Sequence, residues 1–177
     1  PFQAIRCCEQ IKVNLGYMKH KICMVGIASG LVLGNLGFTH CCIEDVGILR
    51  SIPNLTIVSP ADSLEVVKVL QFVLKEKKTS VYIRLTGGVN NPIVYNSDYK
   101  FVLGKAIELT EGGDVTIFSS GSMVYQSLQA SKLLKEKKIN AKVINMHTIK
   151  PIDKKDRDNS LSSKLLVSIV EHNVSGG

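Results

Sequence analysis

One histidine of this sequence, His40, stands in a context suited to chemistry on a small ligand. Glycines precede it at short intervals, and these are Gly30, Gly34 and Gly37. Glycine allows positive φ angles and lets the backbone come close to a ligand. Thr39 is expected to cap a helix over roughly residues 40–52, and Glu44 and Asp45 then lie near its positive end, where carboxylates are favoured. The pattern predicts that His40 is held at the mouth of a helix, where a polar group can meet a small ligand.

The cysteines do not form a pattern typical of a disulfide framework or a zinc site. All five lie within the first 42 residues, and they are Cys7, Cys8, Cys23, Cys41 and Cys42. An odd number without regular spacing favours a reducing, intracellular setting, so we expect a cytoplasmic location. Adjacent cysteines seldom both bind one ion, and no two cysteines are separated by two residues. We therefore expect no metal site in this chain and interpret the cysteines as small buried hydrophobic residues.

The composition excludes some classes of partner. The formal net charge is +7 and 45% of the residues are hydrophobic, which is ordinary for a globular protein with a core. The lysines are scattered without a basic, aromatic-containing stripe, so nucleic-acid binding is not expected, whereas anionic substrates such as sugar phosphates suit the charge. No apolar run reaches the ~18 residues that span a bilayer, and no signal peptide is visible. The chain begins at Pro1 rather than methionine and stops at Gly177, so we expect that both ends are truncated.

Alternating helices and strands must position His40. Short apolar runs and helically spaced apolar residues follow one another, separated by turn signals. The expected elements of the first half are a helix over 3–18, a strand over 21–29, the helix over 40–52, a strand over 56–58, a helix from Ser59 to residues 75–78 and a strand over 81–85. The strand over 21–29 is predicted to be buried on both faces. Ser59 is expected as an N-cap, with Pro60 at the first helical position and Asp62 in the capping box.

A turn-rich connector separates two units. Residues 87–103 lack long periodic runs and contain Gly87-Gly88 and Asn90-Asn91-Pro92. We place a linker there, between a first unit of residues 1–86 and a second unit of residues 104–177. The second unit is expected to have strands over 114–118, 141–146 and 165–170, a turn over 119–122 and a helix over 123–137. Strands that alternate with helices predict an α/β fold with two parallel-sheet units.

Several motifs occur in the order found in the transketolase family of thiamine diphosphate enzymes. The first unit resembles part of the family's pyrimidine-binding domain, with Arg6-x-x-Glu9-Gln10-Ile11, Gly34-x-x-Gly37-x-Thr39-His40-x-x-x-Glu44-Asp45, Leu49-Arg50-x-Ile52-Pro53-Asn54 and Tyr82-Ile83-Arg84. The second resembles a truncated transketolase C-terminal domain, with Leu103-Gly104-Lys105-Ala106, Ile149-Lys150-Pro151-Ile152-Asp153 and Glu171-His172-Asn173. The resemblance covers nearly the whole chain. With Leu36 before Gly37, the chain looks most similar to the C-terminal subunit of split transketolases.

The resemblance implies transfer of a two-carbon ketol unit between sugars or sugar phosphates, carried on thiamine diphosphate. In the family, a Gly-Asp-Gly signature on a separate domain binds the diphosphate and its magnesium, and this sequence has no such signature. The glutamate that activates the cofactor is expected upstream of Pro1. The resemblance therefore implies a diphosphate-binding N-terminal domain or subunit as a partner that holds the magnesium, in a homodimer or a heterotetramer.

The resemblance also indicates candidate site residues. His40 matches the histidine that lies beside the reactive thiazolium carbon and contacts the donor sugar, so it is the candidate catalytic and substrate-binding residue. Phe2, Ile5 and Cys8 match positions around the aminopyrimidine ring, with Phe2 stacked on that ring, although packing within the helix is an alternative for all three. Arg84 is a candidate for binding substrate phosphate, or else it pairs with a carboxylate. Structural or solvated roles are expected for the other histidines, His20, His147 and His172.

Three positions differ from ordinary transketolases. Leu36 stands where many of them have an aspartate that contacts a donor hydroxyl, Ala28 where they have a phosphate-binding histidine, and Gly87 where they have a phosphate-binding arginine. Charge-assisted hydrogen bonds of this kind are worth ~1.5–3 kcal/mol each, so ordinary phosphosugars should bind less well. The alternatives are a non-catalytic transketolase-like subunit for assembly or regulation and, among enzymes, 1-deoxyxylulose-5-phosphate synthase or the beta subunit of a 2-oxoacid dehydrogenase.

Overall fold

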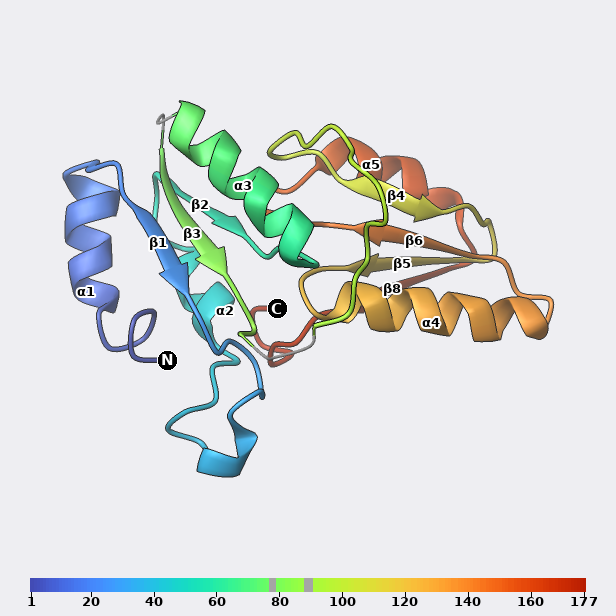
Figure 1. Cartoon of the computed structure of the whole chain (residues 1–177), viewed down its shortest axis with the longest axis horizontal. Helices are drawn as coiled ribbons and strands as arrows, with labels where there is room; N and C mark the ends of the chain where they lie inside the picture. The colour runs from blue at the N-terminus through green and yellow to red at the C-terminus, as the bar shows by residue number, and fades with distance from the viewer. Residues whose placement is uncertain (77–78, 88–90) are drawn as a thin grey trace.

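The computed structural model describes residues 1–76, 79–87 and 91–177, with the side chains of residues 156 and 157 left aside. Two four-stranded sheets with their helices lie next to each other along the long axis of the molecule (Figure 1). This is the α/β fold with two units that the sequence predicts. The expected helix end at residues 77–78 and the turn residues Gly88 and Asn90 lie outside the described residues.

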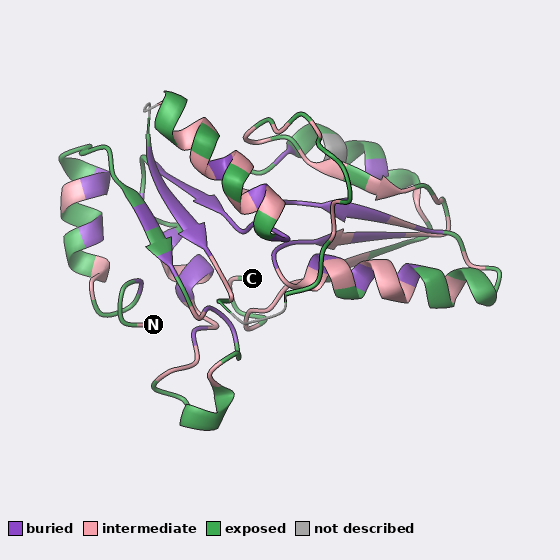
Figure 2. Ribbon diagram, viewed as in Figure 1, coloured by how far each residue is buried: buried purple, intermediate pink, exposed green. Residues whose placement is uncertain are grey.

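The first sheet has the strand order β1-β3-β2-β7. Its strands are β1 (Cys23–Gly26), β3 (Ser80–Arg84), β2 (Leu55–Val58) and β7 (Thr148–Lys150). β3 pairs in parallel with β1 and β2, whereas β7 is antiparallel to β2. The central strands β2 and β3 are buried along their whole length (Figure 2), as expected for parallel strands covered on both faces.

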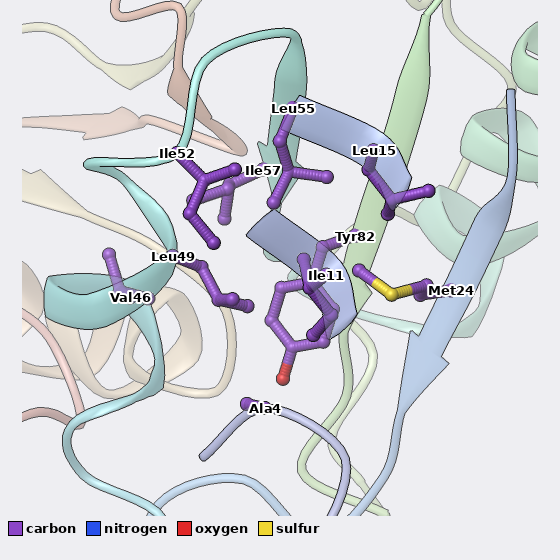
Figure 3. Packing of buried hydrophobic residues seen from close by; sticks show 10 residues of the cluster. All are labelled: Ala4, Ile11, Leu15, Met24, Val46, Leu49, Ile52, Leu55, Ile57 and Tyr82. Carbon is purple, nitrogen blue, oxygen red and sulfur yellow. The ribbon is translucent and has the colours of Figure 1, made fainter. Parts of the chain in front are cut away.

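Helices cover both faces of this sheet. α1 (Cys8–Ile11) continues into the π-helical segment η1 (Lys12–Tyr17), and together with α2 (Asp45–Leu49) it covers one face. The apolar cluster between them, shown in Figure 3, consists of Ala4, Ile11, Leu15, Met24, Val46, Leu49, Ile52, Leu55, Ile57 and Tyr82. On the other face, α3 (Ser63–Glu76) packs through Val69 against Val58, Val81 and Ile83. Burial of each such aliphatic side chain contributes ~1.5–3 kcal/mol, which fixes the helices against the sheet.

The second sheet has the strand order β4-β6-β5-β8. Its strands are β4 (Ile107–Thr110), β6 (Ala141–Asn145), β5 (Val115–Ser119) and β8 (Leu165–Ile169). β5 is parallel to β6 and β8, and β4 is antiparallel to β6. α4 (Met123–Glu136) follows β5, while α5 (Lys154–Asn159) and η3 (Ser160–Ser162) connect β7 to β8. Leu128 and Leu134 of α4 pack against the core of this unit around Ile117 and Val143.

A strand crossover and a buried carboxylate join the two units. β7 follows β6 in the sequence, yet it pairs with β2 in the first sheet. Glu65 of α3 is 0% exposed and accepts hydrogen bonds from Asn145 Nδ2 of β6, at 3.0 and 3.1 Å, and from the hydroxyl of Tyr99, at 2.7 Å. Burial raises the pKa of Glu65 above its usual value. The donors from β6 and the connector stabilise this carboxylate at the boundary between the units.

The helix after His40 begins later than expected. α2 starts at Asp45 rather than near residue 40, and Glu44 rather than Thr39 takes the N-cap position. The expected cap by Thr39 is therefore wrong. Thr39 Oγ1 instead lies 3.0 Å from His40 Nδ1. The carboxylates of Glu44 and Asp45 do lie at the start of the helix, as expected.

The cap of α3 is also displaced from its expected position. α3 begins at Ser63. Glu65 N donates to Asp62 Oδ1 at 2.9 Å and Ala61 N donates to Glu65 Oε2 at 2.7 Å, so Asp62 is the cap and Glu65 completes the capping box. The expected N-cap, Ser59, instead donates its backbone N–H to the carbonyl of His147 at 2.8 Å. That long-range bond ties down the chain where a helix start was expected.

The strand expectations fail at the sheet edges. β1 is an edge strand of four residues, and its residues alternate between exposed and buried, so the prediction of burial on both faces is wrong. The helix expected over 3–18 begins only at Cys8. β4 and β7 are not predicted by the sequence. Because both pair antiparallel with their neighbours, the two sheets are mixed rather than purely parallel.

Candidate functional site

His40 lies on a closed loop that projects from the first sheet, in the blue-to-cyan part of Figure 1. Reciprocal backbone hydrogen bonds between Gly30 and Cys42, at N···O distances of 2.7 and 2.9 Å, close its base. We call residues 31–41 the His40 loop; it contains one 3-10 turn, η2 (Gly34–Leu36). Gly30 and Gly37 have φ angles of +72° and +82°, which glycine adopts without steric cost. The glycines therefore shape the turns of this loop.

A pocket of about 360 Å³ brings His40 together with Phe2. The two rings meet edge to face, with their centroids 5.3 Å apart and their planes at 85°. The guanidinium of Arg6 lies over the Phe2 ring, 4.6 Å from its centroid. The remaining walls are formed by Pro1, Gln3, Ala4, Val25, Gly26, Ile27, Ala28, Ser29, Leu33, Cys42 and Tyr82. A mostly apolar pocket with an aromatic face and an imidazole suits a flat heteroaromatic ligand with polar substituents.

The pocket gathers some of the candidate residues and not others. Phe2, His40 and Ala28 line it together, whereas Ile5 and Cys8 are absent from its described walls. Cys8 packs against the apolar cluster of the first unit, and Ile5 is 38% exposed. For Cys8, the structure thus favours packing within the helix, the alternative that the sequence left open.

Arg84 forms a buried ion pair outside this pocket. Its Nε donates to Asp45 Oδ2 at 2.8 Å, and the two side chains are only 5% and 0% exposed. Its Nη2 donates to the backbone carbonyls of Cys42 at 3.3 Å and Glu171 at 2.8 Å. Tyr82 also donates to Asp45 Oδ2, at 3.0 Å, and burial together with that carboxylate raises the pKa of Tyr82. The carboxylate pairing is therefore present, and a phosphate contact by Arg84 finds no support.

The last residues of the chain dock on the first unit. His172 Nε2 accepts a hydrogen bond from Gly47 N at 3.1 Å, and Asn173 N donates to the carbonyl of Ile43 at 3.0 Å. The expected structural role of His172 is confirmed. The sequence gives no direct signal for the contacts of Asp45 and Glu171. Glu171 could be found only through its place in the Glu171-His172-Asn173 motif, because its partners lie far away in the chain.

The described residues contain no candidate metal centre. Within 1–76, 79–87 and 91–177, no three His, Cys, Asp or Glu side chains gather closely enough to hold an ion. All five cysteines are free thiols, and burial raises the pKa of Cys23 and of Cys42. The same part of the chain has no helix whose length and apolar character would let it cross a membrane.

Two family models match the chain. The pyrimidine-binding domain of transketolase matches residues 2–89, and the transketolase C-terminal domain matches residues 104–177. The first match contains the pocket that holds Phe2 and His40, and the second contains Glu171.

Curated relatives are subunits of transketolases. One of the two kinds of subunit of the apulose-4-phosphate transketolase from Phocaeicola vulgatus is 37% identical over 178 residues, which cover 99% of this chain and 56% of that protein. A subunit of 6-deoxy-6-sulfo-D-fructose transketolase from a Clostridium species is 38% identical over 154 residues, which cover 86% of this chain and 47% of that protein. The chain therefore spans about half the length of the curated relatives it matches.

Solved structures share the arrangement of both units. The inactive beta4 tetramer of a split-gene transketolase matches with a TM-score of 0.88 and 32% identity, over 99% of this chain and 56% of that chain. The transketolase from Campylobacter jejuni matches with a TM-score of 0.72 and 22% identity, over 93% of this chain and 27% of that chain. At that lower identity, the likeness concerns the fold alone.

Proposed function

Because the chain belongs to the transketolase family, we propose that it is the C-terminal region or subunit of an enzyme that transfers a two-carbon ketol unit between sugars. The observation that carries this proposal is the edge-to-face contact of Phe2 and His40 at one pocket. Thiamine diphosphate, when bound, supplies the carbanion chemistry of such a transfer. The residues of this chain bind, orient and exclude water.

Phe2 is proposed to hold the aminopyrimidine ring of the cofactor. Its side chain is 45% exposed, so one aromatic face remains accessible for stacking. Val25, Ile27 and Leu33 add apolar surface to the same pocket, which keeps water away from a bound ring. The volume of about 360 Å³ and the mostly apolar walls fit a pyrimidine ring.

His40 is proposed to contact the oxygens of the donor sugar. Its Nδ1 is engaged by Thr39 Oγ1 at 3.0 Å, so we assign the substrate hydrogen bond to Nε2. A hydrogen bond donated to an oxygen that gains negative charge during the reaction stabilises the transition state more than the ground state. The edge-to-face contact with Phe2 keeps the imidazole at the rim of the pocket.

A partner is proposed to complete the site. The sequence has no Gly-Asp-Gly signature, and the described residues gather no set of three metal ligands. We therefore assign the diphosphate and its magnesium to an N-terminal domain or a separate subunit. The assembly would be a homodimer in the first case and a heterotetramer in the second. The net charge of +7 suits sugar or sugar-phosphate substrates.

The decisive experiment is a ketol-transfer assay on the full-length chain co-expressed with its diphosphate-domain partner. We expect turnover that requires both thiamine diphosphate and magnesium, with at least one donor of a sugar panel. Cofactor binding without turnover for every donor would sink the proposal.

A non-catalytic subunit is the second candidate, and the pocket wall favours it. Ala28 contributes only a methyl group to the pocket, and a Cβ built on the nearby Gly87 would lie 3.1 Å from Ala28 N. Neither position offers a charge to a substrate phosphate. If this alternative holds, the full-length chain assembles with its partner and binds cofactor, and the same assay detects no transfer.

A further inference from the structure

The base of the His40 loop is held from outside by two side chains. Inside the loop, the backbone hydrogen bonds are short-range turns. At the first residue of the loop, Leu31 N donates to Glu171 Oε1 at 2.8 Å. On the other side of the base, Arg84 Nη2 donates to the carbonyl of Cys42 at 3.3 Å. Both sides of the base are thus tied to groups that come from distant parts of the chain.

Glu171 links this base to the second unit. Its Oε2 accepts a hydrogen bond from Ser122 Oγ at 2.7 Å, just before the first residue of α4. Its backbone carbonyl accepts the bond from Arg84 Nη2 at 2.8 Å. Hydrogen bonds to an ionised carboxylate are shorter and stronger than those between neutral groups. The loop, α4 and β3 therefore fix one residue from three directions.

Gly30 leaves the space that this carboxylate occupies. Its φ angle is +72°, and a Cβ at this position would lie 2.2 Å from Glu171 Cδ and 2.4 Å from Glu171 Oε1. A side chain at position 30 and the present position of the carboxylate are mutually exclusive. The sequence therefore carries a glycine and a glutamate that fit each other across the two units.

We propose that Glu171 is a positioning residue, which orients the His40 loop and so places His40 against the substrate. This inference rests on the proposed function, because His40 needs a substrate to contact. His40 lies two residues before Cys42, so a tilt at the base moves the imidazole relative to Phe2. A displacement of about 1 Å in a catalytic arrangement can lower the rate by about 100-fold. Through Ser122, the second unit then takes part in the site without touching it.

The experiment compares Glu171→Ala and Glu171→Gln with the unmutated full-length chain bound to its partner. Glu171→Ala removes both acceptor oxygens, so amides 31–42 should exchange hydrogen about 10–100 times faster, and kcat/KM for the donor should fall by a similar factor. The affinity for thiamine diphosphate should stay unchanged, because Phe2 is untouched. Glu171→Gln keeps the shape and one acceptor oxygen and should recover part of both losses. Glu111→Ala, which removes an exposed carboxylate, is the matched control.

The exchange measurement separates this inference from the proposed function, because it needs no substrate. Unchanged exchange of the loop amides in both Glu171 variants would overturn the inference, whatever the activity. Faster exchange with unaltered kcat/KM in an active enzyme would also overturn it, since the loop orientation would then be irrelevant to His40. If the unmutated complex shows no transfer with any donor, the proposed function fails, and the exchange data alone decide whether Glu171 holds the loop.

A double variant tests the fit between Gly30 and Glu171. Gly30→Ala should displace the carboxylate and produce the same faster loop exchange as Glu171→Ala. Because both changes break one contact, the double variant should exchange no faster than the more affected single variant. Additive effects on the exchange rate would show that the two residues act separately and would overturn the matched pair.

Discussion

At the scale of residues, His40 is set apart from the other histidines by its surroundings. It touches Phe2 at the rim of a pocket, His172 is hydrogen-bonded to α2, and His147 is fully buried. His20 is exposed. The same side chain therefore has different chemistry at each position, and two of these differences can be measured.

Replacing His40 with Ala should lower kcat far more than it lowers affinity for thiamine diphosphate. The imidazole is assigned to the sugar and Phe2 to the cofactor, and a positioned acid–base or hydrogen-bonding side chain typically contributes about 10²–10⁴-fold. Steady-state kinetics and calorimetric titration of the full-length complex measure the two quantities. His20→Ala, an exposed histidine, is the control. Lost affinity with preserved kcat would contradict the placement of His40.

His147 should make the protein less stable at mildly acidic pH. Its ring lies 4.6 Å from that of Phe101, and burial lowers its pKa from 6.5 to about 4. Between these values the unfolded chain binds a proton that the folded chain does not, so the free energy of unfolding falls as the pH drops through this window. The loss approaches about 3 kcal/mol at the acidic end.

Urea unfolding at a series of pH values measures this effect. His147→Asn should remove the part of the pH dependence that falls between 6.5 and about 4, even if the variant is less stable at neutral pH. His20→Ala should keep the slope of the unmutated chain. An identical slope in the unmutated chain and in His147→Asn would show that another group is responsible.

At the scale of elements, α3 tests where a helix begins. Asp62 Oδ1 accepts the bond of Glu65 N, and its Oδ2 accepts bonds from the backbone N–H groups of Val94 and Tyr95, both at 2.9 Å. One side chain thus caps the helix and fastens the connector. Its loss leaves three backbone donors without their acceptor, which is more than the loss of an ordinary cap.

Asp62→Ala should therefore lower the free energy of unfolding by about 2 kcal/mol or more. Ser63→Ala, at the first residue of α3, is the matched control and should change it by less than about 0.5 kcal/mol. Chemical denaturation of both variants provides the comparison. Equal losses would mean that the cap is not formed by Asp62.

At the scale of the whole molecule, the boundary between the two units is polar and buried. Asn145 Nδ2 from β6 donates to both carboxylate oxygens of Glu65 on α3 and to the hydroxyl of Tyr95 at 2.7 Å. Asn145 itself is 0% exposed. A buried carboxylate without its donors is costly, so this contact couples the stability of one unit to that of the other.

Asn145→Ala should reduce the free energy of unfolding by about 3 kcal/mol, because hydrogen bonds to a charged group are lost in a buried place. Hydrogen exchange should become faster in α3 as well as in β6. Gln71→Ala, an exposed change on α3, is the control. Faster exchange confined to the second unit would argue against the coupling.

Local signals in the sequence predict the central elements well. β2, β5 and α4 lie close to their expected ranges, because apolar runs and helical periodicity depend on residues a few positions apart. β4 and β7 have no such signal, since each is short and exists through pairing with a distant strand. The start of α3 differs from its expected place for the same reason, because a distant carbonyl binds the backbone of Ser59.

The sequence by itself determined the family, the α/β fold and the two residues, Phe2 and His40, that the pocket joins. These follow from residue types and from the order of motifs along the chain. Only the tertiary structure decided that Arg84 pairs with Asp45 and that Glu171 reaches the base of the His40 loop. Such contacts join residues far apart in the chain, and packing of the sheets and helices around buried apolar clusters sets which of them can meet.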